Sequence, residues 1–191
     1  MLTHKGTVTL RTARLTLRRF ILDDAQAVHD SYTSDEHVAK YHDMDAHMSV
    51  EDTSEMLIES IADYDNLQNY YWAVEYDGII VGEINFFDID NEQGKCEVGY
   101  TVGSKWWNHG IATEALAEVI RFAFAEVNLN KVFARTDPVN ISSCKVMQKN
   151  NMKQEGLFRE DKVRKDGTRR DTVFYAALKR EWMKDWTMMS Q

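Results

Sequence analysis

The residues from Glu97 to Ala115 form a pattern that could bind an anion. An apolar strand ending at Val102 is followed by a turn of small residues and then by a helical pattern. The backbone N–H groups in the first turn of a helix have no partner within the helix, and together with the helix dipole they attract an anion that can approach them. Because Gly110, Ala112 and Thr113 are small, they leave that approach open. We therefore predict a phosphate-binding loop, although small residues at such a turn can also serve packing alone.

Periodicity predicts the elements that position this loop. Apolar residues that alternate between turn signals such as Asp77-Gly78 predict strands, and apolar residues that recur every three or four positions predict helices. The expected strands are 15–20, 70–76, 79–87, 95–102, 131–136, 153–163 and 168–178. The expected helices are about 23–34, 49–64, 110–127 and 141–149, and a polar, His-rich stretch separates the first two. This order predicts an α+β fold, a mixed α/β sandwich, with no internal repeat.

Composition indicates one globular domain. A chain of 191 residues with 43% hydrophobic and 28% charged residues is long enough for one sizeable core but short for two. We expect a single domain over residues 1–191 with its core at about 12–178. The chain has no apolar run long enough to cross a bilayer and no secretory signal at its N-terminus, so we expect a cytoplasmic location and no membrane partner. Two cysteines, Cys96 and Cys144, are too few for a disulfide framework.

The net charge of −8 argues against a protein that coats nucleic acid, because such binding depends on neutralising phosphates with a positive surface. It does not exclude an anionic cofactor, since a helix N-terminus creates a local positive potential within an acidic protein.

The loop itself resembles a known motif. Trp107-Asn-His-Gly110-Ile-Ala112 is similar to the coenzyme A-binding motif of the GCN5-related N-acetyltransferase (GNAT) family, in which Gln/Arg-x-x-Gly-x-Gly/Ala follows the fourth strand and opens a helix. Trp107 stands where the broad family has Gln or Arg. The RimJ/RimL-like branch, which acetylates the N-termini of ribosomal proteins, commonly carries Trp-Gly-x-Gly-x-Ala-Thr-Glu-Ala. The chain resembles that branch more closely, with Asn108 in place of the first glycine.

Three further parts of the chain resemble the same branch, so the resemblance runs from about Thr12 to Leu178. They correspond to the opening strand with the first helix cap, to the Asn-x-x-Ser helix with the strand after it, and to the terminal hairpin. In this sequence they read Thr12-Ala-Arg-Leu-Thr-Leu-Arg18 with Asp23-Asp24-Ala25; Asn140-Ile-Ser-Ser143-Cys-Lys-Val146 with Asn150-Asn-Met-Lys-Gln-Glu-Gly156-Leu-Phe-Arg159; and Asp166-Gly167 with Asp171 and Tyr175.

The resemblance implies the GNAT acyl-CoA N-acyltransferase fold, whose mostly antiparallel sheet of six to seven strands is flanked by helices and splays between strands 4 and 5. It also implies acetyl-CoA as cosubstrate and no metal. Backbone groups of Thr101 and Val102 would bind the pantetheine arm and polarise the thioester carbonyl, and Asn140 and Ser143 would contact the coenzyme. The residues implied to hold its pyrophosphate are Trp107, Asn108, His109, Gly110, Ile111, Ala112 and Thr113.

Catalytic roles follow from the resemblance and from the chemistry of acyl transfer. Ser143 would be the acid, because the resembling branch places a serine near the coenzyme sulfur, where its hydroxyl can hydrogen-bond or protonate the leaving thiolate. Asn and Ser also favour helix caps, so a purely structural role for Asn140 and Ser143 stays open. Glu97 is the candidate base, because a carboxylate on the coenzyme-binding strand could deprotonate an ammonium directly or through a water.

Two other groups of residues receive no catalytic assignment. Cys144 follows Ser143, but the sequence identifies no base or positive group that would activate its thiol. The spacing of His37, His42 and His47 matches no standard metal-ligand pattern. We expect this segment, with Tyr41, to form part of the wall that contacts the acceptor.

The resulting hypothesis is an N-acetyltransferase that moves an acetyl group to a primary amine by direct transfer in a ternary complex. The acceptor would be a protein N-terminus or a small amine, and the protein would act as a monomer or a homodimer without nucleic acid. The alternative is a non-catalytic acyl-CoA-binding module that senses or docks.

Overall fold

The computed structural model describes residues 1–42, 45–182 and 184, with the His42 side chain also left out. The strands are hydrogen-bonded in the order β1-β2-β3-β4-β5-β6-β8-β7, and every neighbouring pair with a known register is antiparallel except β5 and β6. Contacts divide the chain into two compact units. The first unit contains residues 4–87 and 99–118, and the second unit contains residues 1–3, 88–98 and 119–191.

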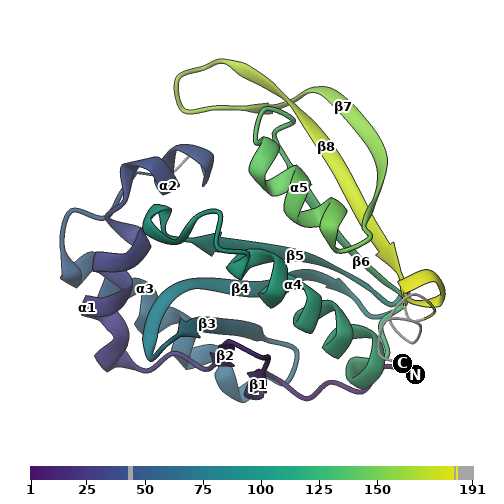
Figure 1. Cartoon of the computed structure of the whole chain (residues 1–191), viewed down its shortest axis with the longest axis horizontal. Helices are drawn as coiled ribbons and strands as arrows, with labels where there is room; N and C mark the ends of the chain where they lie inside the picture. The colour runs from purple at the N-terminus through teal and green to yellow at the C-terminus, as the bar shows by residue number, and fades with distance from the viewer. Residues whose placement is uncertain (43–44, 183, 185–191) are drawn as a thin grey trace. The chain divides into compact units, whose positions relative to one another are not determined.

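The first unit packs short helices on the antiparallel strands of the N-terminal half (Figure 1). Its strands are β1 (Leu10–Arg11), β2 (Leu15–Arg18), β3 (Tyr70–Tyr76), most of β4 (Ile79–Asp90) and the end of β5 (Lys95–Val102). Its helices are α1 (Ala25–Val28), which continues as a π-helix through His29–Thr33, α2 (Glu36–His42), α3 (Val50–Ala62) and the start of α4 (Ile111–Phe122). Single 3-10 turns occupy Leu22–Asp24, Asp63–Asp65 and Ser104–Trp106.

The core of the first unit lies between its helices and strands. Its buried members are Phe20, Ala25, Val28, Tyr32, Val38, Leu57, Ala73 and Ile80. Ser49 starts α3 with a capping box, since its hydroxyl accepts from the Asp52 N–H while the Asp52 carboxylate accepts from the Ser49 N–H. This cap sets where α3 begins, and Leu57 on the buried face of α3 is fully inaccessible to solvent.

The second unit is built around the last strands. It contains the first part of β5, the end of α4 with a π-helix at Ala123–Val127, β6 (Lys131–Thr136), α5 (Ile141–Lys149), β7 (Lys153–Val163) and β8 (Arg169–Leu178). The strands β7 and β8 form a long hairpin (Figure 1). Its turn contains Gly167 at a φ of 79°, the left-handed region that a glycine adopts without strain.

The structure confirms most of the predicted elements. The bounds of β3, β5, β6, α5 and β7 are those read from the sequence, and Asp77 and Gly78 both have positive φ, as a two-residue hairpin turn requires. The sheet has eight strands rather than six to seven because a two-residue strand, β1, pairs with β2. The polar stretch after residue 34 was expected to have no helix, and it contains α2.

The ladder between β5 and β6 is short. Its recorded pairs are Lys95–Lys131, Cys96–Val132 and Glu97–Phe133, although β5 runs on to Val102 and β6 to Thr136. No helix among the described residues is long and apolar enough to cross a membrane.

Candidate functional site

The turn between β5 and α4 has the geometry of an anion-binding loop. Asn108 and Gly110 both adopt left-handed backbone conformations, with φ of 64° and 79°, and α4 begins at Ile111. Asparagine is one of the few side chains that tolerate this region, so Asn108 can take the place of a glycine. The N–H groups in the first turn of α4 therefore follow two tight bends that turn the chain into the helix.

Hydrogen bonds within the loop hold this shape. The Trp107 indole N–H donates to the Val102 carbonyl at 2.7 Å, and Nδ1 of His109 lies 3.0 Å from the Trp107 carbonyl. The exposed Trp107 ring thereby ties the loop back to the last residue of β5. Trp107 therefore positions the loop. Where the broad family motif has Gln or Arg, this chain has an indole that is hydrogen-bonded to the end of β5.

Arg14 joins the loop to the first turn of α4. Its guanidinium donates from Nε to Glu114 Oε2 at 2.7 Å and from Nη1 to the His109 carbonyl at 3.1 Å. Burial alone would raise the pKa of Glu114, but hydrogen bonds from Thr12 and Arg14 outweigh it and lower that pKa. Arg14 was not among the predicted site residues. The sequence signal that could have indicated Arg14 is the Thr12-Ala-Arg14 segment. This segment was interpreted only as part of the opening strand.

The segment predicted to form the acceptor wall packs against the same loop. The Ser104 N–H donates to Asp35 at 3.1 Å, and the rings of Tyr41 and Trp107 meet edge to face with centroids 6.1 Å apart. His47 lies apart from this contact, with Nδ1 2.8 Å from the Thr53 hydroxyl. Among the described residues no group of His, Cys, Asp and Glu side chains could hold a metal ion.

A half-buried carboxylate lies at the centre of the first unit. Oε2 of Glu83 on β4 accepts the hydroxyl of Tyr32 at 2.9 Å and that of Tyr71, and Oε1 accepts the Thr101 hydroxyl at 3.3 Å. Burial, with the nearby Glu83 charge, raises the pKa of both tyrosines well above the ordinary value. Glu83 was not predicted from the sequence, because its partners are 12 to 51 positions away along the chain.

In the second unit, Glu97 is buried against Arg135. The glutamate is 3% exposed, and its Oε1 accepts from Arg135 Nε at 2.9 Å. Its Oε2 is buried without a hydrogen-bond partner among the described residues. Burial raises the pKa of Glu97 more than Arg135 lowers it, so the carboxylate is a stronger base than an exposed glutamate.

The Asn-x-x-Ser motif starts α5. The side-chain oxygen of Asn140 accepts from the Ser143 N–H at 3.1 Å, which is an N-cap, and the Ser143 hydroxyl is not part of that bond. Cys144 is buried, and burial raises its pKa despite a hydrogen bond with Tyr175. A thiol with a raised pKa is a poor nucleophile at neutral pH.

Comparison with known proteins identifies the family. Residues 14–153 match the model of the acetyltransferase (GNAT) domain. The chain belongs to the GNAT acetyltransferase family. It is 32% identical over 176 residues to the uncharacterized N-acetyltransferase p20 of Bacillus licheniformis, covering 91% of this chain and 98% of that protein.

Other GNAT proteins support the same placement. A crystal structure of a GNAT-family acetyltransferase from Bacillus anthracis superposes with a TM-score of 0.79 at 30% identity, covering 91% of this chain and 99% of that one. The ribosomal protein uS5 alanine N-acetyltransferase of Escherichia coli is 29% identical over 104 residues, 54% of this chain and 53% of that protein. Homologues of this GNAT chain therefore include enzymes of the RimJ/RimL-like branch.

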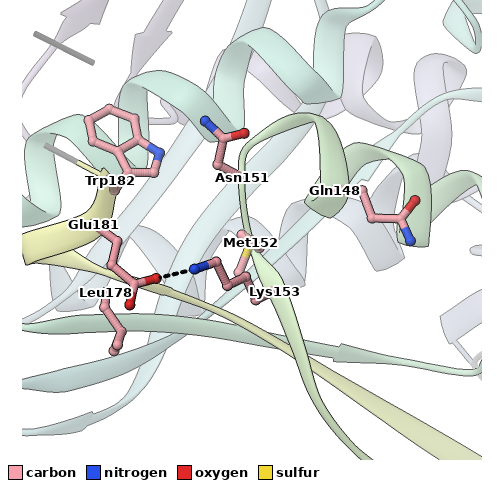
Figure 2. A pocket seen from close by; sticks show the side chains of 7 residues that line it. All are labelled: Gln148, Asn151, Met152, Lys153, Leu178, Glu181 and Trp182. Atoms are coloured by element: carbon pink, nitrogen blue, oxygen red, sulfur yellow. Dashed lines mark hydrogen bonds and ion pairs between the residues drawn. The ribbon is translucent and has the colours of Figure 1, made fainter. Parts of the chain in front are cut away.

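A separate pocket lies in the second unit of this GNAT chain, beside the C-terminal end of β8 (Figure 2). It is lined by Gln148, Asn151, Met152, Lys153, Leu178, Glu181 and Trp182, and an ion pair joins Lys153 to Glu181 at 2.7 Å. None of the predicted site residues lines it, and its two charged groups neutralise each other. We therefore assign it no part in the chemistry.

Proposed function

We propose that this protein transfers the acetyl group of acetyl-CoA to a primary amine by direct transfer in a ternary complex. The observation that carries the proposal is the β5–α4 loop, where left-handed residues at Asn108 and Gly110 lead into the first turn of α4. Membership of the GNAT family supports the same reaction. Acetyl-CoA, when bound, supplies an acetyl group activated as a thioester.

The loop fits a pyrophosphate in three respects. The start of α4 supplies backbone N–H groups without partners inside the helix, the helix dipole there favours negative charge, and the small residues of the loop allow close approach. Gly110 has a φ of 79°, so any side chain at this position would strain the bend. Trp107 would keep the loop attached to β5.

The remaining residues would act on the acyl group. Backbone groups of Thr101 and Val102 would position the pantetheine arm and the thioester carbonyl. As the amine nitrogen bonds to the carbonyl carbon and the carbon–sulfur bond breaks, Ser143 would give a proton to the departing sulfur, and Glu97 would take the proton that the amine loses. Asn140 would contact the coenzyme through the amide nitrogen that its cap leaves available.

The acceptor class is inferred from the relatives of this chain. Similarity to a ribosomal protein uS5 alanine N-acetyltransferase favours a protein N-terminus, and a small amine is the alternative. The rival function, a non-catalytic acyl-CoA sensor, predicts coenzyme binding without thiol release.

The test combines turnover with a charge at the loop. The protein is incubated with acetyl-CoA and a panel of small amines and N-terminal peptides while free thiol is followed. Thiol release with one acceptor class supports the transferase, and tight coenzyme binding without release for any acceptor supports the sensor.

Ala112→Glu tests the loop, and Ala112→Gln is its matched control. A carboxylate in the first turn stabilises the helix but repels a bound phosphate, so we expect Ala112→Glu to weaken acetyl-CoA binding by tenfold or more while Ala112→Gln, of the same size, does not. Gly110 is unsuitable for this test, because its φ of 79° strains any side chain. Equal affinity in both variants would mean that the pyrophosphate binds elsewhere.

A further inference from the structure

Glu83 is a half-buried carboxylate whose three partners are all neutral hydroxyl groups, those of Tyr32, Tyr71 and Thr101. Within the described part of the chain no Lys, Arg or His side chain pairs with it. Three other buried or half-buried carboxylates of this unit have a cation, since Asp24 and Glu75 pair with Arg18 and Glu114 pairs with Arg14. A carboxylate withdrawn from water without a cation costs stability, and this chain carries that cost at Glu83.

The surrounding hydroxyls orient the carboxylate and leave part of it available. Oε2 accepts from two tyrosines, whereas Oε1 accepts only from Thr101 at 3.3 Å. Each carboxylate oxygen can accept about two hydrogen bonds, so Oε1 retains capacity for another donor. Burial raises the pKa of both tyrosine hydroxyls well above the ordinary value, so neither tyrosine adds a charge to the cluster at neutral pH.

The position of Oε1 connects it to the predicted donor site. Thr101, whose hydroxyl contacts Oε1, lies on β5 immediately before Val102, where the thioester arm is proposed to bind. Tyr32 comes from the π-helix that continues α1, and the carbonyl of its neighbour Ser31 lies against Gly103 at the end of β5. π-helical turns of this kind occur frequently at functional sites.

We propose that Glu83 binds the ammonium group of the acceptor, with Oε1 receiving the new hydrogen bond and Tyr32 and Tyr71 holding the carboxylate in place. This inference rests on the proposed function, and it names the acceptor as an amine that arrives protonated. The ammonium neutralises the one unpaired half-buried charge of the cluster and places the acceptor nitrogen beside the strand that carries the thioester. Glu83 is thus a specificity-determining residue.

Binding is tested without turnover. Backbone amide signals of Tyr32, Tyr71 and Thr101 are followed by NMR while n-butylammonium chloride is added, with n-butanol and sodium chloride as controls for shape and for ionic strength. We expect saturable shifts with n-butylammonium alone, lost in Glu83→Gln and kept in Glu59→Gln, which removes an exposed glutamate of α3. Equal shifts with n-butanol, or shifts that persist in Glu83→Gln, would overturn the proposal.

Turnover separates recognition from a structural role. With the best acceptor of the panel, Glu83→Gln should raise the acceptor KM at least tenfold while the acetyl-CoA Kd and the melting temperature stay near those of the parent protein. If Glu83 had only a structural role, Glu83→Gln would instead lower the melting temperature and leave the acceptor KM unchanged. Should Glu83→Gln fail to fold, Tyr71→Phe removes one tether and should raise the same KM by a smaller factor, and an unchanged KM would refute the role.

The two proposals fail in different ways. If no amine releases thiol but n-butylammonium still binds at Glu83, the transferase proposal fails and the ammonium site stands. If thiol is released and Glu83→Gln turns over with an unchanged acceptor KM, the ammonium site fails and the transferase stands.

Discussion

Replacement of Arg135 by methionine should destabilise the protein in a way that depends on pH. Arg135 is the only hydrogen-bond partner of the Glu97 carboxylate among the described residues, at 2.9 Å, and the second carboxylate oxygen is already buried without one. Methionine fills much of the volume of the side chain but removes the charge. Glu97 then remains as an unpaired carboxylate that is 3% exposed.

The size of the effect follows from the burial of the two partners. Breaking a fully buried ion pair by removing one partner costs about 3–5 kcal/mol. The Arg135 side chain is 45% exposed and partly screened by water, so we expect a smaller loss of about 1–3 kcal/mol at pH near 8. For a chain of this size each kcal/mol lowers the melting temperature by about 2–4 °C.

The sign of the pH dependence comes from Glu97. Burial raises its pKa in the folded protein, so between the unfolded and folded pKa values the folded state binds more protons, and stability falls as pH rises. Loss of Arg135 raises the folded pKa further and extends this window upward. The gap between variant and parent should therefore be small below the ordinary pKa of a glutamate and widen towards pH 8.

Urea unfolding followed by circular dichroism at about pH 5 and pH 8 measures this gap. The double variant Arg135→Met with Glu97→Gln removes the stranded charge and should recover most of the loss at the higher pH. The carboxylate of Asp88 lies 3.7 Å from Arg135. Because the single and the double variant both keep Asp88 and both lack Arg135, the effect of Asp88 cancels when these two variants are compared. An equal loss at both pH values, or no recovery in the double variant, would refute the assignment of the effect to the Glu97 charge.

Three further predictions concern other parts of the site. Glu97→Gln should shift the pH profile of turnover towards higher pH if Glu97 is the base, and an unchanged profile would remove that role. Gly103→Ala should lower the free energy of unfolding in urea by about 1–3 kcal/mol and raise the acceptor KM, because its Cβ would lie 2.1 Å from the Ser31 carbonyl oxygen. An unchanged free energy of unfolding would contradict this close approach of Ser31 to Gly103. Ser143→Ala should lower turnover of the acetyl-CoA reaction, whereas Asn140→Ala should cost about 1 kcal/mol of stability because the Asn140 side chain caps α5. Full activity of Ser143→Ala would mean that the Asn-x-x-Ser motif serves only as the N-cap of α5.

Local signals in the sequence predicted most of the fold. The Asp77-Gly78 turn and the start of a helix at about residue 49 are signals that act over a few residues, and β3 ends, and β4 and α3 begin, where the pattern placed them. The missed helix α2 also has a local signal. Asp35 accepts from the His37 N–H at 2.9 Å, as an N-cap does, but the polar residues after it hid the helical periodicity.

In the candidate site, too, the sequence predicted the residues that lie in one continuous segment and not those that meet across long distances in the sequence. The β5–α4 loop could be predicted because it is one continuous segment with glycine and small residues at fixed spacing. Glu83 could not, because a lone glutamate in an apolar strand shows its role only once residues from a helix and two other strands surround it. Arg135 was missed for a similar reason, since it meets Glu97 across 38 positions of sequence.

Two glycines explain how these distant residues reach one another. A Cβ at Gly82 would lie 2.1 Å from the Thr101 carbonyl oxygen, and one at Gly103 would lie 2.1 Å from the Ser31 carbonyl oxygen. Neither has the positive φ that requires glycine, so what requires glycine at both positions is close approach rather than backbone freedom. Gly82 brings β4 against Thr101, which sets the neighbouring Glu83 within reach of the Thr101 hydroxyl. Gly103 brings the π-helix of Tyr32 against the end of β5. Glu83 is therefore positioned by residues without side chains, and a larger residue at either place would separate it from β5.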